Sequence, residues 1–133
     1  MKRITEEEFW ELYEMLPESL QTQIFSSKTA SAIQGILERH DLMGEKGEDI
    51  PELVGNILLG VTPEEKLEAE LEAMGIKKQK AEEVGNEIYN AVLKPVRIDL
   101  EKIQRNKKRK ERLKNAPGTE SEEESSDEYS ESL

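Results

Sequence analysis

The residues with the clearest chemical potential are eight basic side chains within thirteen positions near the C-terminus. They are Lys102, Arg105, Lys107, Lys108, Arg109, Lys110, Arg112 and Lys114. One carboxylate, Glu111, lies among them, so residues 102–114 have a net charge of +7. Such a run can neutralise phosphates and release counterions, which gives salt-sensitive binding to a polyanion. No aromatic side chain is interleaved for base stacking, so sequence-specific recognition of a single strand is not expected.

The chain becomes acidic directly after this run. Residues 115–133 carry seven carboxylates and no basic side chain, and their Ser/Glu-rich composition predicts a disordered tail over 117–133. The opposite charges leave two interpretations of the basic run open. It solubilises a helix end and pairs with the tail, or it binds a phosphate-bearing or acidic partner while the tail competes. Phosphorylation of serines in the tail would strengthen that competition.

Other reactive side chains are scarce. The chain has no cysteine and one histidine, His40, which excludes disulfides, thiolate metal sites and a two-histidine metal site. We expect His40 to lie at the end of a helix beside Asp41, where an imidazolium interacts favourably with the helix dipole; a ligand or base role is the alternative. Helical spacing spreads the carboxylates over outer faces, and none can be assigned the apolar setting of a catalytic acid. The sequence therefore predicts no enzymatic activity, no metal and no cofactor.

Three aromatic side chains gather near the N-terminus, at Phe9, Trp10 and Tyr13. Phe9 and Tyr13 fall in one apolar stripe with Leu12 and Leu16, so we expect most of these rings to lie in the core. Adjacent residues of a helix point roughly 100° apart. One of Phe9 and Trp10 can therefore lie at the edge of the buried face, and an exposed aromatic ring there would mark a partner-binding groove. Trp10 is the candidate partner-binding residue.

Capping residues and apolar spacing predict the elements that position these side chains. The pattern is that of an all-α protein, a compact bundle of six or seven short helices with no strand. Capping boxes are predicted at Thr5 with Glu8 and at Thr62 with Glu65, the second with Pro63 at the first helical position. The predicted helices cover about 5–16, 17–24, 27–40, 50–60, 63–75, 78–92 and 95 onward.

Three of these helices carry specific packing expectations. In the third we expect Ala30 and Ile33 to face inward, with Ile36 and Leu37. The fourth has the cleanest stripe in the chain, formed by Ile50, Leu53, Val54, Ile57, Leu58 and Val61. Gly85 shares a face with Ala81 and Ile88 in the sixth, where the missing side chain permits close approach of another helix.

The last helix changes character along its length. Val96, Leu100 and Ile103 form an apolar seam, but lysines occupy the positions that continue it. Because a helix cannot bury lysine where it buried leucine, we expect the chain to leave the bundle and project into solvent after about residue 103. This divides it into a helical body (1–101), a basic helical arm (102–116) and a disordered acidic tail (117–133).

Targeting and membrane signals are not found. No apolar run approaches the roughly 18 residues of a membrane span, and the basic N-terminus has no apolar core of a secretory signal after it. We expect a cytoplasmic protein.

Several helix caps and core positions together resemble a group of small, uncharacterised helical proteins of candidate-phyla bacteria. They are Leu16-Pro17, Ile24-Phe25-Ser26, Thr29-Ala30, Val54-Gly55, Leu58-Leu59-Gly60, Pro63-Glu64-Glu65, Ala81, Ile88 and Pro95-Val96. The likeness covers about residues 14–103. It implies an all-helical cytoplasmic protein and carries over no site residue.

The functional expectation is a non-enzymatic protein–protein interaction module, with a C-terminal arm that modulates binding electrostatically. The alternative is a nucleic-acid-associated accessory protein that contacts phosphate through residues 102–114. Residues 1–101 carry a net charge of −11, which repels a polyanion outside the arm. An exposed apolar patch on the body would favour the first interpretation, and a basic face beyond the arm would favour the second. We expect no membrane partner and no small-molecule substrate.

Overall fold

The computed structural model describes residues 1–115, except the side chains of Lys46, Lys114 and Asn115, and this part of the chain is all-α, without a strand. Its contacts divide the chain into two units, Met1–Glu101 and Lys102–Leu133. The α-helices are α1 (Glu6–Glu14), α2 (Glu18–Phe25), α3 (Ser27–Arg39), α4 (Ile50–Leu58), α5 (Leu67–Ala73), α6 (Lys78–Ile88) and α7 (Arg97–Asn115). Short turns lie at η1 (Glu45–Gly47), η2 (Glu64–Lys66) and η4 (Lys94–Val96), and η3 (Tyr89–Leu93) is π-helical.

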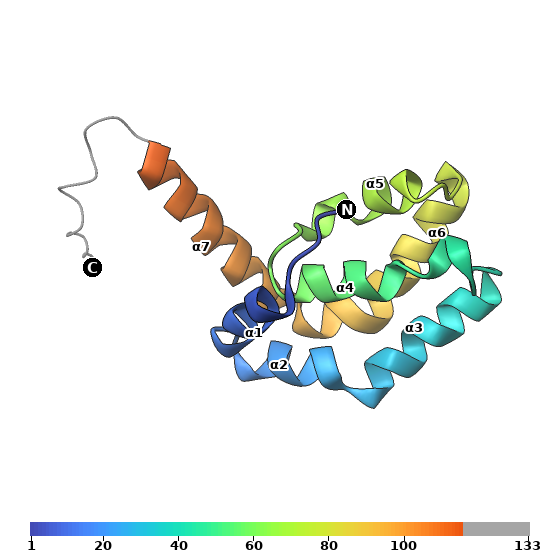
Figure 1. Ribbon diagram of the computed structural model, residues 1–133, viewed down its shortest axis with the longest axis horizontal. Helices are drawn as coiled ribbons and strands as arrows, with labels where there is room; N and C mark the ends of the chain where they lie inside the picture. The colour runs from blue at the N-terminus through green and yellow to red at the C-terminus, as the bar shows by residue number, and fades with distance from the viewer. Residues whose placement is uncertain (116–133) are drawn as a thin grey trace. The chain divides into compact units, whose positions relative to one another are not determined.

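Helix α4 lies at the centre of the first unit, packed against α2 and α5 (Figure 1). Its inward stripe is the one predicted from spacing, and Ile50, Leu53, Val54, Ile57 and Leu58 are each at most 1% exposed. Gly60 ends the helix with a φ of +84°, which a residue without Cβ adopts at no steric cost. The predicted stripe and terminator of this helix are confirmed, although Val61 is only half-buried.

The first helix begins at the predicted capping box. The Thr5 hydroxyl accepts the backbone N–H of Glu8 at 3.0 Å, and the Glu8 carboxylate accepts the backbone N–H of Thr5 at 2.8 Å. Two donors that would otherwise lack a helical partner are therefore satisfied.

The second predicted capping box is wrong. α5 begins at Leu67, after the 3₁₀ turn η2, and no side chain caps the start of either element. Thr62 is 5% exposed, and its backbone N–H donates to the carbonyl of Asn56 at 3.2 Å. Thr62 thus belongs to the buried end of α4, which explains why its hydroxyl does not cap the next helix.

Helix α3 is rotated slightly from the predicted orientation. Its buried residues are Thr29, Ile33, Ile36 and Leu37, and Ala30 is exposed. The expectation for Ala30 was therefore wrong, because the stripe at i, i+4, i+7 and i+8 begins at Thr29 and leaves Ala30 beside it.

The predicted close helix approach occurs between α5 and α6. Gly85 is buried, and a Cβ at this position would lie 3.2 Å from Cγ of Glu68. α6 continues through η3 and η4 into α7, and Leu100 in the first turns of α7 is 2% exposed. No helix within residues 1–115 is long and apolar enough to cross a membrane.

Candidate functional site

Four of the six aromatic side chains of the protein form one cluster at α1 and α2. The members of this aromatic patch are Phe9, Trp10, Tyr13 and Phe25. The ring centroids of every pair lie between 4.9 and 6.1 Å apart. Phe9 stacks on Tyr13 and Trp10 on Phe25, and the other pairs meet edge to face, which are the arrangements that aromatic rings favour.

The aromatic patch is a surface rather than a core. Trp10 is 45% exposed and Phe25 59%, while Phe9 and Tyr13 are half-buried. The expectation that most of the N-terminal rings lie in the core is wrong, because α1 contains no buried residue. Its apolar stripe meets one exposed ring of α2 instead of the bundle interior. Of the two adjacent rings at which an edge position was considered, Trp10 is the exposed one and Phe9 is half-buried.

Sequence reasoning missed Phe25, although a signal was present. Leu20 on the same helix is fully buried. Phe25 follows it by five residues, which places the two side chains about 140° apart around the helix axis. Once Leu20 is assigned to the core, Phe25 must point away from it.

Helix α2, which carries Phe25, is attached to the later helical segments by two side-chain hydrogen bonds. The Gln23 side-chain amide donates to the backbone carbonyl of Val92 in η3 at 2.6 Å, and the Ser19 hydroxyl donates to the carboxylate of Asp99. The Gln21 amide donates to the backbone carbonyl of Tyr13 at 2.8 Å and thereby ties α1 to α2.

The segment before α1 is fastened to α4. Arg3 forms ion pairs with Asp49 at 3.1 Å and with Glu52 at 2.6 Å. The buried amide of Asn56 donates to the backbone carbonyl of Lys2 at 2.7 Å. Helix α1 is therefore held from both sides, and its exposed rings have a defined position.

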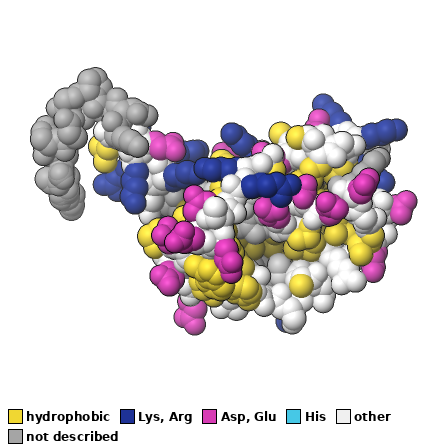
Figure 2. Space-filling view, in the orientation of Figure 1, with side chains coloured by type: hydrophobic (Ala, Val, Ile, Leu, Met, Phe, Trp, Pro, Cys, Tyr) yellow, Lys and Arg dark blue, Asp and Glu magenta, His cyan; other side chains and the backbone are white. Residues whose placement is uncertain are grey.

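Negative charge surrounds the aromatic patch. Between Arg3 and Lys28 the chain has six glutamates and no basic side chain. All six are exposed, and we call them the acidic border: Glu6, Glu7, Glu8, Glu11, Glu14 and Glu18. Figure 2 shows a broad hydrophobic area with acidic side chains at its edge, over the region of α1 and α2.

The predicted polyanion-binding residues lie on α7, which is helical as far as Asn115. The described side chains at 102, 105, 108, 109, 110 and 112 are exposed, and Lys107 is half-buried. Helical spacing distributes these cations around the whole helix circumference instead of along one face. The side chain of Lys114 and the tail expected over 117–133 lie outside the described residues.

His40 is the C-cap of α3, at the helix end as predicted, and its side-chain partner comes from α6. Its Nε2 lies 2.7 Å from Oε2 of Glu87, and Arg39 donates to Oε1 of Glu87 at 2.5 Å. The hydrogen bond from Arg39, followed by that with His40, holds the pKa of the Glu87 carboxyl below its usual range. Lys80 donates to the His40 carbonyl at 3.0 Å. These contacts join α3 to α6.

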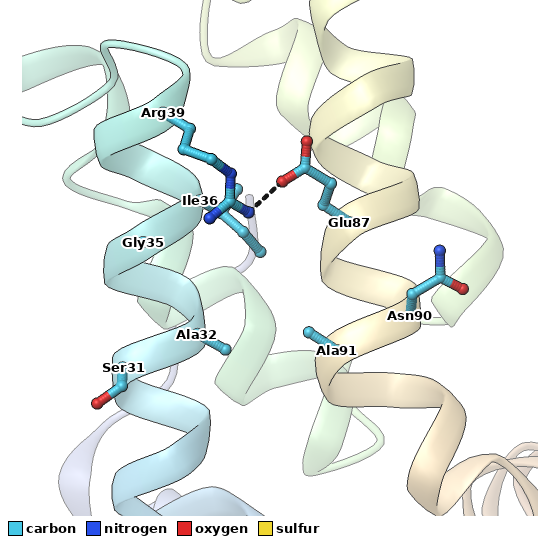
Figure 3. A pocket seen from close by; sticks show the side chains of 8 residues that line it. All are labelled: Ser31, Ala32, Gly35, Ile36, Arg39, Glu87, Asn90 and Ala91. Carbon is cyan, nitrogen blue, oxygen red and sulfur yellow. Dashed lines mark hydrogen bonds and ion pairs between the residues drawn. The ribbon is translucent and has the colours of Figure 1, made fainter.

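A shallow pocket of about 420 Å³ lies beside this pair (Figure 3). Arg39 and Glu87 point toward one another at one end, and Ala32 and Ala91 face each other farther along. The lining residues are Ser31, Ala32, Gly35, Ile36, Arg39, Glu87, Asn90 and Ala91. Because Arg39 and His40 both engage the Glu87 carboxylate, that carboxylate serves helix packing.

One carboxylate that sequence analysis did not single out has a raised pKa. Glu64 lines a second pocket of about 290 Å³ with Glu65, Glu68 and Tyr89. Partial burial raises the pKa of its carboxyl, and the charges of Glu101 and Glu65 add to this effect. Within residues 1–115 no group of three or more His, Asp or Glu side chains has the arrangement of a metal site.

Neither a family model, nor a curated protein, nor a solved structure matches this chain.

Proposed function

We propose that the protein is a non-enzymatic, cytoplasmic interaction module that binds another protein through the aromatic patch. The single observation that carries this proposal is the cluster of four mutually packed rings, two of them 45% and 59% exposed. An apolar surface of this kind on a soluble chain is typical of a binding site.

The residue types suit this role. Trp, Tyr, Phe and Met are enriched at protein interfaces, and buried Trp and Tyr residues are frequent sources of binding energy. Aromatic rings have few rotatable bonds, so fixing them in a complex costs little conformational entropy. In the patch the rings already support one another, which lowers that cost further. Met15 is the C-cap of α1 and is 76% exposed, so the end of this helix also presents a flexible apolar side chain.

The experiment is site-specific photocrosslinking in the native cell. A photoreactive phenylalanine replaces Phe25 in one variant and Met43, 55% exposed, in a matched control. We expect a crosslinked protein from position 25 that is missing from position 43 and lost when Trp10→Ser is added. The purified protein and the captured partner must then bind each other directly. Equal crosslinking from both positions, or none from position 25, would refute the proposal.

The second candidate is polyanion binding through residues 102–114, supported by the exposed cations of α7. Its test is fluorescence anisotropy with labelled RNA and DNA over a salt series. Replacing Arg105, Arg109 and Arg112 with Gln should weaken binding to all nucleic-acid sequences. The slope of log K against log salt concentration should become shallower by an amount that corresponds to about three phosphate contacts. Deleting 117–133 should tighten binding if the tail competes. No binding by the full chain or the truncated chain at low salt would exclude this function.

A further inference from the structure

We infer that the partner presents a cationic amphipathic segment, in which one or two large apolar side chains are flanked by Lys or Arg. This inference rests on the proposed docking function of the aromatic patch and adds the chemistry of what docks there. Two independent features carry it: the exposed rings at the centre and the acidic border around them.

The acidic border has no ion-pair partner among the described residues of Met1–Glu101, the unit to which it belongs. The hydrogen bond that Glu8 makes is to the backbone N–H of Thr5 and brings no positive charge. A docked partner therefore meets exposed negative charge along α1, which favours cations at its rim and speeds their encounter.

The rings themselves also favour positive charge. The face of an aromatic ring attracts an ammonium or guanidinium group, most strongly for Trp. Trp10 and Phe25 are the most exposed rings, and they are stacked at 19° with centroids 6.0 Å apart. A Lys or Arg of the partner can contact a ring and a carboxylate of the border together, while a neighbouring Leu or Phe covers the remaining apolar surface.

The same charges argue against the other occupants of an exposed aromatic surface. A symmetric contact with the patch of a second copy would bring twelve glutamates together, and like charges at an interface are strongly unfavourable. Anionic lipid and nucleic acid would be repelled for the same reason. The charge thus selects a basic protein segment.

The test measures binding of the full-length protein to three fluorescein-labelled peptides that lack Trp and are about two heptads long. The first combines Leu and Lys with the Leu residues on one helical face. The second keeps the Leu face and replaces Lys with Glu. The third keeps the Lys residues and replaces Leu with Ser. We expect the Leu/Lys peptide to bind at least roughly tenfold more tightly than either control, and severalfold more weakly as salt is raised.

Matched variants locate the binding. Phe25→Ser should weaken binding of the Leu/Lys peptide by roughly tenfold, and Met43→Ser should leave it unchanged. Replacing Glu7, Glu11 and Glu14 together with Gln should weaken it severalfold, whereas the same change at the exposed Glu38, Glu72 and Glu82 should have little effect.

Each remaining outcome overturns the inference. Equal binding of the Leu/Glu peptide would show docking without a preference for cations. Equal binding of the Lys/Ser peptide, or insensitivity to Phe25→Ser, would show attraction to a generally acidic protein that does not use the rings. If no peptide binds while crosslinking from position 25 still captures a specific partner, the docking function stands and the proposed chemistry of the partner is wrong.

Discussion

Helices α1 and α4 have the same kind of sequence pattern but differ in the burial of their apolar stripes. Each has nine residues and an apolar stripe at helical spacing. In α4 six residues are buried, and α2 and α5 cover the stripe. In α1 no residue is buried, and the stripe contributes Phe9 and Tyr13 to an exposed patch, with Trp10 beside it as the third ring of this helix. Periodicity therefore identifies the apolar face of a helix but does not identify what covers it.

Which elements pack over the apolar face of a helix depends on residues outside that helix. The position of α1 is fixed by bonds of the Gln21 and Asn56 side chains, and by ion pairs of Arg3. The contacts of Gln21 and Arg3 are polar and lie at the periphery, where local unfolding costs less than in a core, and only Asn56 is buried. We expect α4 to determine global stability and α1 to determine binding, and the following experiments separate the two.

The largest effect is expected in α4. Leu53→Ala removes a fully buried side chain and should lower the free energy of unfolding by about 2–5 kcal/mol. Phe25→Ala removes a larger but exposed ring and should cost less than about 1 kcal/mol. Urea unfolding followed by circular dichroism measures both. A larger cost for Phe25→Ala than for Leu53→Ala would show that the aromatic patch is part of the core.

Asn56→Ala links the two regions. It removes the hydrogen bond from a buried amide to the Lys2 carbonyl and should cost about 1–2 kcal/mol. Amide hydrogen exchange should speed up in α1 as well as at the end of α4, since the segment before α1 loses one of its attachments and keeps the ion pairs of Arg3. Exchange that rises in α4 alone would show that the Asn56 hydrogen bond does not hold α1 in place.

Thr5→Ala acts on α1 alone. The bond from the Glu8 backbone N–H to the Thr5 hydroxyl is lost, while the backbone N–H of residue 5 can still donate to the Glu8 carboxylate. A removed N-cap costs typically about 1 kcal/mol. Because α1 buries no residue, we expect the loss of its N-cap to speed up hydrogen exchange in α1 and to weaken peptide binding. The urea midpoint should change little. A midpoint shift as large as that of Asn56→Ala would contradict the separate roles of α1 and α4.

The smallest effect is expected at Glu87, far from both helices in sequence. Its pKa is lowered in the folded state, so its carboxylate contributes stability that is full above the unfolded value of roughly 4.3 and is lost as pH falls through the lower folded value. The stability difference between wild type and Glu87→Gln should therefore shrink on acidification below about pH 4. The exposed Glu83→Gln serves as the control. A difference that is constant with pH would exclude ionic pairing with Arg39 and His40.

Much of the fold is predictable from local signals. The all-α class, the capping box at Thr5, the stripe of α4 and the close approach at Gly85 each depend on neighbours in sequence or on one helix face. Thr62 failed as a cap because tertiary burial at the end of α4 overrode a local pattern. The expectation for Ala30 was wrong because Thr29 and Ala30 are adjacent and both small, so the spacing specifies the rotation of α3 only to within one position.

The candidate site was only partly predictable for the same reason. Trp10 was identified from its position beside the apolar stripe. Phe25 lies on another helix, and nothing local brings it to Phe9 and Tyr13. The partnership of His40 with Glu87 likewise joins residues 47 positions apart. A site assembled across helices requires their packing to be known.

The most direct test of the central claim uses Trp10, which is the only tryptophan of the protein and lies in the aromatic patch. Its fluorescence is measured with increasing acrylamide, alone and with saturating Leu/Lys peptide. We predict that the peptide protects Trp10, with weaker quenching and a blue-shifted emission. If anisotropy shows the peptide bound while quenching and emission stay unchanged, the peptide binds elsewhere and the aromatic patch is not the docking surface.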